Sequence, residues 1–209
     1  MDKYPSKLLK DAVEAISSLP GVGSRSALRL ALHLLKQPSE NIHHFASAID
    51  RLAEEVKYCS CCNMIADAEL CSVCSDSRRD HNTICVVESV RDVMSIEQTG
   101  QYNGVYHVLG GIISPINGVG PSDLKIAGLL ARVKAAEAPV EIILALSGDV
   151  EGETTSFYIY RQVESMECFA QGKVRMSALA RGLGFGDDLE YADSLTLGRS
   201  IACRQPFRP

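Results

Sequence analysis

The sequence lacks any apolar run long enough to cross a membrane. A membrane-spanning helix needs about 18 or more consecutive apolar residues, and no stretch of the 209 residues approaches that length. The first ten residues are too polar to form the apolar core of a secretory signal peptide. We therefore expect a cytoplasmic protein that has no membrane partner.

The chain also lacks the excess of positive charge that is typical of proteins that coat nucleic acid. Its net charge is −5 and its isoelectric point is near 5.6, so any contact with DNA has to come from a local basic surface. Residues 1–36 offer one, because six Lys and Arg residues there stand against three acids. The remainder of the chain then carries a net charge of −8.

No internal repeat or low-complexity segment interrupts the sequence, and its hydrophobic content of 46% is sufficient for a buried core. Apolar spacing predicts three helices in the N-terminal part, over residues 6–18, 24–36 and 40–57. Pro20 and two glycines end the first helix and permit a tight reversal, after which we expect Ser24 to cap the second.

Strand and helix patterns alternate from residue 83 onward. Strands are predicted at 84–87, 105–109 and 140–146, and helices at 89–100, 123–137 and 151–166, the first opened by a capping box at Ser89 to Asp92. Such alternation predicts an α/β fold with a mostly parallel sheet covered by helices. The Gly- and Pro-rich stretch 110–121 is expected to be a long functional loop.

Cysteine is abundant, and five of the eight cysteines lie between residues 59 and 74. Reduced thiols at this density in the cytoplasm indicate a metal site rather than disulfides. Two Cys-x2-Cys units separated by eight residues predict one structural zinc with four sulfur ligands: Cys59, Cys62, Cys71 and Cys74. Cys61 does not fit this spacing and is left over, and the scattered Cys85, Cys168 and Cys203 are expected to be small buried apolar residues.

The segment between the first two helices has the features of a DNA-binding hairpin. Gly21 and Gly23 form a turn that can present backbone N–H groups at a helix N-terminus to a DNA phosphate, without reading the base sequence. Arg25 and Arg29 are spaced to share one face of the following helix with His33 and Lys36. The alternative interpretation is an ordinary helical hairpin with a solvated charged face.

Acidic residues follow two of the predicted strands. Glu88 ends the first strand, and Asp149, Glu151 and Glu153 follow the strand at 140–146. Carboxylates at the carboxyl ends of parallel strands converge where α/β ligands bind, so these four could hold Mg²⁺ together with water. The alternative is that they simply favour the start of a helix, where acids complement the helix dipole.

Taken together, these segments resemble the RecR recombination-mediator family from about residue 4 to residue 204. The resemblance rests on the order of a helix-hairpin-helix, a four-cysteine zinc site and a Toprim domain. It also rests on sequence strings at residues 19–23 (LPGVG), 29–35 (RLALHLL), 83–88 (TICVVE), 104–109 (GVYHVL), 114–121 (SPINGVGP), 150–153 (VEGE) and 189–199 (LEYADSLTLGR). It divides the chain into a hairpin region at 1–57, a zinc finger at 58–80, a Toprim domain at 81–176 and a C-terminal segment at 177–209, with oligomer contacts expected in the last.

The resemblance implies a non-enzymatic repair factor, associated with the nucleoid, that forms a tetrameric ring. Such a factor joins RecO and RecF and helps to load RecA onto gapped DNA covered by SSB. The family's basic hairpin residues match Arg25 and Arg29. Its Toprim acids match Glu88 and the string from Ser147 to Glu153. The resemblance implies that these acids form a docking surface for RecO.

One departure bears on catalysis. The acids of Toprim enzymes are similar to the pattern Asp-x-Asp-x-Glu-Gly-Glu. The matching string in this chain, residues 147–153, has Ser147 in place of the first aspartate. Losing a carboxylate weakens a Mg²⁺ site, which favours a DNA-binding mediator over the competing interpretation of a Mg²⁺-dependent enzyme that cleaves or joins DNA.

Overall fold

The computed structural model describes residues 4–180, 182 and 189–202. It divides the chain into two compact units, residues 1–56 and 57–209. Within the described residues, no helix combines the length and the apolar character that a membrane span requires. Cys203 and part of the C-terminal segment expected at 177–209 lie outside the described residues.

The first unit consists of three helices, α1 (Lys7–Ser17), α2 (Ser24–Leu34) and α3 (Ser39–Glu55). Helices α1 and α2 pack as a hairpin around Val13, Ala27 and Ala31, which are almost completely buried. The small alanine side chains let the two helices approach closely. Helix α2 begins differently from our expectation: its cap is Gly23, whose carbonyl accepts the N–H of Ala27 at 2.9 Å, and Ser24 is already helical.

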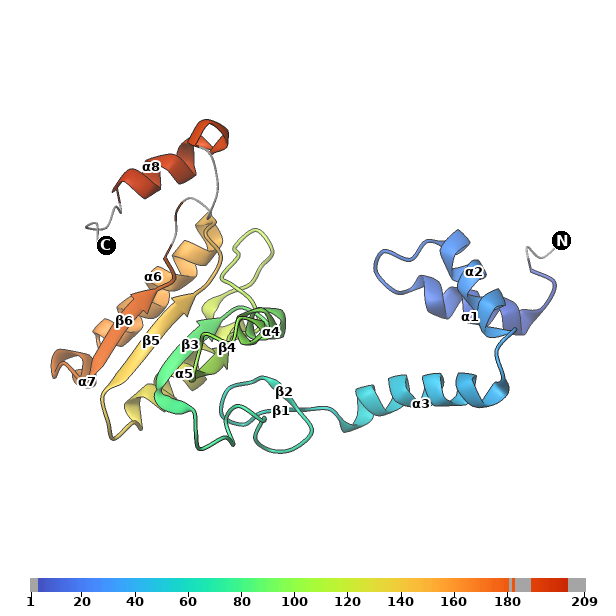
Figure 1. Ribbon diagram of the computed structural model, residues 1–209, viewed down its shortest axis with the longest axis horizontal. Helices are drawn as coiled ribbons and strands as arrows, with labels where there is room; N and C mark the ends of the chain where they lie inside the picture. Colours follow the sequence, from blue (N-terminus) through green and yellow to red (C-terminus); the bar gives the residue numbers. More distant parts are fainter. Residues whose placement is uncertain (1–3, 181, 183–188, 203–209) are drawn as a thin grey trace. The chain divides into compact units, whose positions relative to one another are not determined.

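The second unit is built on a four-stranded sheet (Figure 1). Its strands are β3 (Asp80–Val87), β4 (Gly104–Val108), β5 (Val140–Ala145) and β6 (Val174–Ala178). They pair in the order β4-β3-β5-β6, and every pairing is parallel. The predicted α/β class is therefore confirmed, although β6 was not predicted from the sequence.

Helices cover both faces of this sheet (Figure 1). Helices α5 (Ile126–Lys134) and α6 (Val150–Glu164) pack on one face through Leu129, Ile159 and neighbouring apolar residues, and α4 (Val90–Gln98) packs on the other through Val93. Two short helices, α7 (Glu167–Ala170) and α8 (Ser194–Ala202), complete the described helical elements.

The predicted helix at 123–137 is wrong at its start. A 3-10 turn, η1 (Pro121–Asp123), is followed by an extended Leu124, and α5 begins only at Ile126.

The predicted cap of α4 is present, since the Asp92 carboxylate accepts both the backbone N–H and the hydroxyl of Ser89, at 2.8 and 2.9 Å. A second 3-10 turn, η2 (Leu189–Tyr191), precedes α8.

The cysteine-rich segment enters the second unit through a small antiparallel pair, β1 (Lys57–Tyr58) and β2 (Ile65–Ala66). Its attachment to the sheet is direct, because the Val108 N–H donates to the Cys62 carbonyl at 2.8 Å. Arg79 adds a second attachment by donating to both carboxylate oxygens of Glu97 on α4 and to the carbonyl of Tyr102. The segment is thus fixed to the edge of the sheet that β4 forms.

Candidate zinc centre, basic hairpin and acidic strand ends

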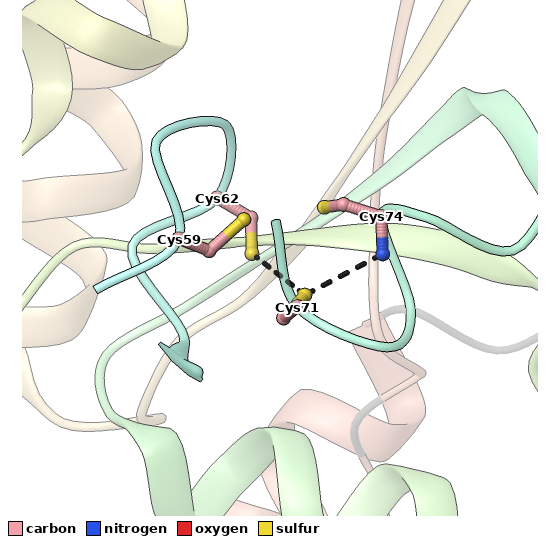
Figure 2. A group of neighbouring side chains, drawn as sticks. All are labelled: Cys59, Cys62, Cys71 and Cys74. Atoms are coloured by element: carbon pink, nitrogen blue, oxygen red, sulfur yellow. Dashed lines mark hydrogen bonds between the residues drawn. The ribbon is translucent and has the colours of Figure 1, made fainter. Parts of the chain in front are cut away.

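Two tight turns bring the predicted zinc ligands together (Figure 2). In the first turn, the Cys59 N–H donates to the Met64 carbonyl at 2.7 Å and the Asn63 N–H donates to the Cys59 carbonyl at 3.0 Å. Asn63 adopts a left-handed backbone with φ of 61°, a conformation that asparagine tolerates better than most residues. In the second turn, the Cys74 N–H donates to the Cys71 Sγ at 3.4 Å.

The four thiols have the separation that a tetrahedral metal site requires. All four sulfur atoms lie within 4.8 Å of one another, and Cys62 Sγ lies 3.5 Å from Cys71 Sγ. Zinc–sulfur bonds of about 2.3 Å place tetrahedral sulfurs about 3.8 Å apart, so the ligand set fits zinc after adjustments of an ångström or less. The side chains are buried, and few apolar residues surround them; metal coordination therefore replaces a hydrophobic core here.

The thiols also perturb one another's ionisation. A hydrogen bond with Cys74 is the main factor that lowers the pKa of Cys62, to about 5, whereas burial raises the pKa of Cys71 to about 11. One thiolate is favoured within the group, and a bound cation stabilises the others as thiolates. Cys61 is half-buried and packs against the cluster without belonging to the group of four.

The hairpin between α1 and α2 is closed by a tight glycine turn. Gly21 adopts φ of 81°, which a residue with a side chain rarely does, and the Val22 N–H closes the turn on the Leu19 carbonyl at 3.1 Å. Gly23 then opens α2. The first N–H groups of any helix have no partners within the helix, so those at the start of α2 are available as donors to an anion.

Arg25 and Arg29 are both exposed on α2. Together with Lys36 and His33 they line a shallow groove of about 460 Å³, to which Leu28 and Leu32 add apolar surface. The predicted residues thus share one basic face.

The predicted acids Glu88, Asp149 and Glu151 each accept a hydrogen bond within the protein, and Glu88 and Asp149 both bond to Ser147. Glu88 accepts the backbone N–H of Ser147, and Asp149 caps α6 by accepting the Gly152 N–H at 2.7 Å. Ser147 Oγ donates to the same Asp149 oxygen at 2.9 Å. Among the described residues, the four cysteines form the group that could hold a metal through three or more His, Cys, Asp or Glu ligands, and the acids do not form one.

Glu151 anchors the long loop that follows β4. Its carboxylate accepts the Ser114 hydroxyl at 2.5 Å, while Thr155 on the same helix accepts the Ile113 N–H at 2.9 Å. Glu151 and Glu153 are half-buried. The sequence analysis missed Ser114 and Thr155, although both lie in or beside the strings that carry the family resemblance. The bond of Ser114 to Glu151 spans 37 residues and that of Thr155 to Ile113 spans 42, so neither has a local signal in the sequence.

The structure explains why residue 152, within the acidic string 149–153, is a glycine. A Cβ at this position would overlap the carbonyl oxygen and hydroxyl of Ser147. The first turn of α6 can therefore pack against the end of β5 only because residue 152 has no side chain.

Comparison with known proteins accounts for the described domains in order. Family models match at residues 9–53 (RecR, helix-hairpin-helix), 56–76 (the RecR zinc finger domain of the four-cysteine type), 82–180 (Toprim domain) and 182–205 (RecR, C-terminal). The protein named Recombination protein RecR from Flavobacterium johnsoniae is 53% identical over 98% of this chain and 96% of its own length. That of Porphyromonas gingivalis is 52% identical over 99% of this chain and 97% of its own length. The chain belongs to the RecR family.

Membership in the RecR family and the clustered cysteines together confirm the prediction of one structural zinc. They also confirm the predicted sequence of helix-hairpin-helix, zinc finger and Toprim domain. A closed site of four buried sulfurs has no open coordination position, so its role is in folding and not in catalysis. The roles assigned above to the basic and acidic residues stay predictions.

Proposed function

We propose that this RecR-family chain is a non-enzymatic DNA-binding mediator of recombinational repair. In this proposal it acts with RecO and RecF to load RecA onto gapped DNA covered by SSB, as a tetrameric ring associated with the nucleoid in the cytoplasm. The observation that carries the proposal is the exposed basic face of α2, in a chain that is otherwise acidic and that matches recombination proteins from end to end. The division at residues 57, 80 and 176 is part of the same proposal.

The DNA contact in this proposal is made with phosphates. The turn at Gly21 and Gly23 offers backbone N–H groups, and Arg25 and Arg29 add two cations on the same helix. Contacts of this kind carry no base-sequence information. Binding is therefore sequence-independent and weakens as salt concentration rises.

The RecO contact in this proposal uses the acidic first turn of α6. Three acids lie within five residues there, Asp149, Glu151 and Glu153, and no basic residue intervenes. Such a local negative field attracts a basic partner surface. The hydrogen bond from Ser114 holds Glu151 in place, so the loop and the helix present one surface.

The Toprim match at residues 82–180 also favours a second candidate, a Mg²⁺-dependent enzyme that cleaves or joins DNA. Two observations weigh against it. Ser147 occupies the position of a carboxylate, and the remaining Asp149 serves as the cap of α6. One or two carboxylates can still hold Mg²⁺ with water, so the two functions have to be separated by experiment.

A strand-cleavage assay beside a binding assay tests the proposal. The zinc-loaded protein is incubated with supercoiled plasmid and with gapped DNA, once with added Mg²⁺ and once without any added divalent cation. We expect DNA to be retained on the protein in both conditions and to stay uncut and unrelaxed. Mg²⁺-dependent nicking or relaxation that disappears in the Glu88→Gln variant would establish the enzyme instead.

A further inference from the structure

A cavity of about 720 Å³ opens at the carboxyl ends of β3 and β4, on the side of the sheet where the zinc segment is attached. Tyr58 and Asn63 line it from the zinc segment, Glu88 from the end of β3, and Gly110 and Gly111 from the loop after β4. The carboxyl ends of parallel strands are the usual place for ligands in α/β folds. Its volume lies within the range of roughly 300–1,000 Å³ found for small-molecule sites.

Backbone hydrogen bonds fix the walls of this cavity relative to one another. The Val108 N–H holds the zinc turn through the Cys62 carbonyl at 2.8 Å, and the Gly110 N–H donates to the Glu88 carbonyl at 3.0 Å. The Lys125 N–H donates to the Leu109 carbonyl at 2.9 Å. The cavity is thus preformed, which lowers the entropic cost of binding a ligand.

The lining combines three chemical features. The ring of Tyr58 is exposed, with 68% of its surface accessible, although a tyrosine is usually at least partly covered. Arg91 and Lys125 add two exposed cations. Gly110 and Gly111 have φ of 85° and 149° and no side chains, so a ligand can approach their backbone closely.

We infer that this cavity binds one unpaired nucleotide of a DNA strand. Tyr58 stacks on the base, Arg91 and Lys125 contact the flanking phosphates, and the Glu88 carboxylate accepts a hydrogen bond from an N–H group of the base, which every DNA base offers. Aromatic stacking combined with cations is how proteins hold single strands without reading their sequence. An acidic peptide would satisfy the two cations but supplies no flat ring to stack on Tyr58, so the lining favours a nucleotide.

This inference rests on the proposed DNA-binding function but uses a surface other than the α2 groove. It adds a preference for single strands to a protein whose hairpin contacts phosphates of any strand. Failure of the two ideas can therefore be distinguished with two DNA probes, a single-stranded thymidine oligomer and a blunt duplex.

The test compares binding of both probes by the zinc-loaded full chain, using fluorescence anisotropy at one fixed salt concentration. We expect Tyr58→Ala, and the double variant Arg91→Ala with Lys125→Ala, to lower affinity for the single strand roughly tenfold and to leave duplex affinity within about twofold. Tyr58→Phe keeps the ring and should bind like the wild type. Lys134→Ala with Lys173→Ala, which also removes two exposed positive charges but from outside the cavity, is the matched control. Melting temperature and zinc content confirm that each variant is folded.

Photocrosslinking gives a second measurement that does not depend on a variant. An oligonucleotide that carries iododeoxyuridine should crosslink to the peptide containing Tyr58. Unchanged single-strand affinity of Tyr58→Ala, together with crosslinks elsewhere, would overturn the inference while leaving the α2 site intact. Loss of binding to an Asp- and Glu-rich peptide in the Arg91→Ala/Lys125→Ala variant, with unchanged oligomer binding, would assign the cavity to an acidic peptide instead. Absence of binding to either DNA by the wild type would contradict the proposed function itself.

Discussion

At the scale of single residues, the cysteines differ sharply in what they contribute. Cys71 belongs to the buried group of four sulfurs, whereas Cys61 packs beside it. Cys85 is a buried apolar residue, as expected, and burial raises the pKa of its thiol to about 12, whereas Cys168 is only half-buried. These thiols should therefore respond differently to substitution.

We predict that Cys71→Ser loses zinc and unfolds the segment around residues 57–79, because structural zinc binding is worth about 10 kcal/mol or more of folding free energy. Cys61→Ser should retain one zinc per chain and melt within a few degrees of the wild type. Zinc content by atomic emission and melting by circular dichroism make the comparison. Equal zinc loss in both variants would mean that Cys61 is a ligand.

His107 is a buried base that makes stability depend on pH. It is 1% exposed; its Nε2 bonds to the Lys125 carbonyl at 2.9 Å, and its Nδ1 has no hydrogen-bond partner among the residues that the structure describes. Burial lowers the pKa of His107 from 6.5 to about 4. Above pH 6.5 the ring is neutral in both folded and unfolded chains, so it imposes no penalty there.

Below pH 6.5 the unfolded chain binds a proton that the folded chain excludes, so stability falls until the folded pKa near 4 is reached. The shift corresponds to a loss of about 3 kcal/mol across that window. We predict that the free energy of unfolding falls by that much more in the wild type than in His107→Gln, measured by urea denaturation from pH 7 to pH 4. Loss of zinc in acid affects both proteins, so parallel curves would show that His107 does not titrate in this way.

At the scale of elements, the sequence predicted the turns, caps and strands that depend on residues close together in the chain. The two Cys-x2-Cys turns, the capping box at Ser89 and the strands β3 to β5 depend on neighbours in sequence or on continuous apolar runs, and each was predicted. Strand β6 was missed although Val174, Met176 and Ala178 alternate with polar residues, because it is a short edge strand of five residues that is buried mainly at Val174. The strand order was not predicted, because it depends on contacts between distant parts of the chain. The same holds for the bond between Glu151 and Ser114, which are 37 positions apart, and for the bond between Glu88 and Ser147, which are 59 positions apart.

A further prediction concerns DNA binding by the basic face of helix α2. Replacing both Arg25 and Arg29 by alanine should weaken binding to all DNA sequences alike, since the two side chains are expected to contact phosphates. Each lost phosphate contact lowers the slope of log affinity against log salt by about 0.9, so the slope should fall by about 2. Exchanging both for lysine keeps the charge and should restore most of the binding.

The measurement is DNA binding by anisotropy at several salt concentrations, with zinc content and melting temperature as checks on the fold. An unchanged salt slope in the alanine variant would move the phosphate contacts to another basic surface, such as Lys7 and Lys10 on α1.

At the scale of the whole molecule, the chain joins a basic hairpin to an acidic Toprim domain through a zinc segment. Residues 1–36 carry a surplus of three positive charges and the rest carries −8. This polarity suits a protein that meets DNA with one part and a basic protein with the other. In our account these two contacts, and no chemistry on DNA, constitute the function.

The most direct test of that account is capture of RecO by the wild type and by three variants at the loop anchor. Glu151→Lys reverses a charge in the acidic patch but also removes the bond from Ser114. Ser114→Ala removes the same bond without changing the charge, and Glu151→Gln removes the charge while keeping an acceptor for Ser114. We expect Glu151→Lys to abolish RecO capture, Glu151→Gln to weaken it and Ser114→Ala to retain it, with DNA binding nearly intact in all three. RecO capture by Glu151→Lys at the wild-type level, accompanied by loss of a Mg²⁺-dependent cleavage of DNA, would contradict the account.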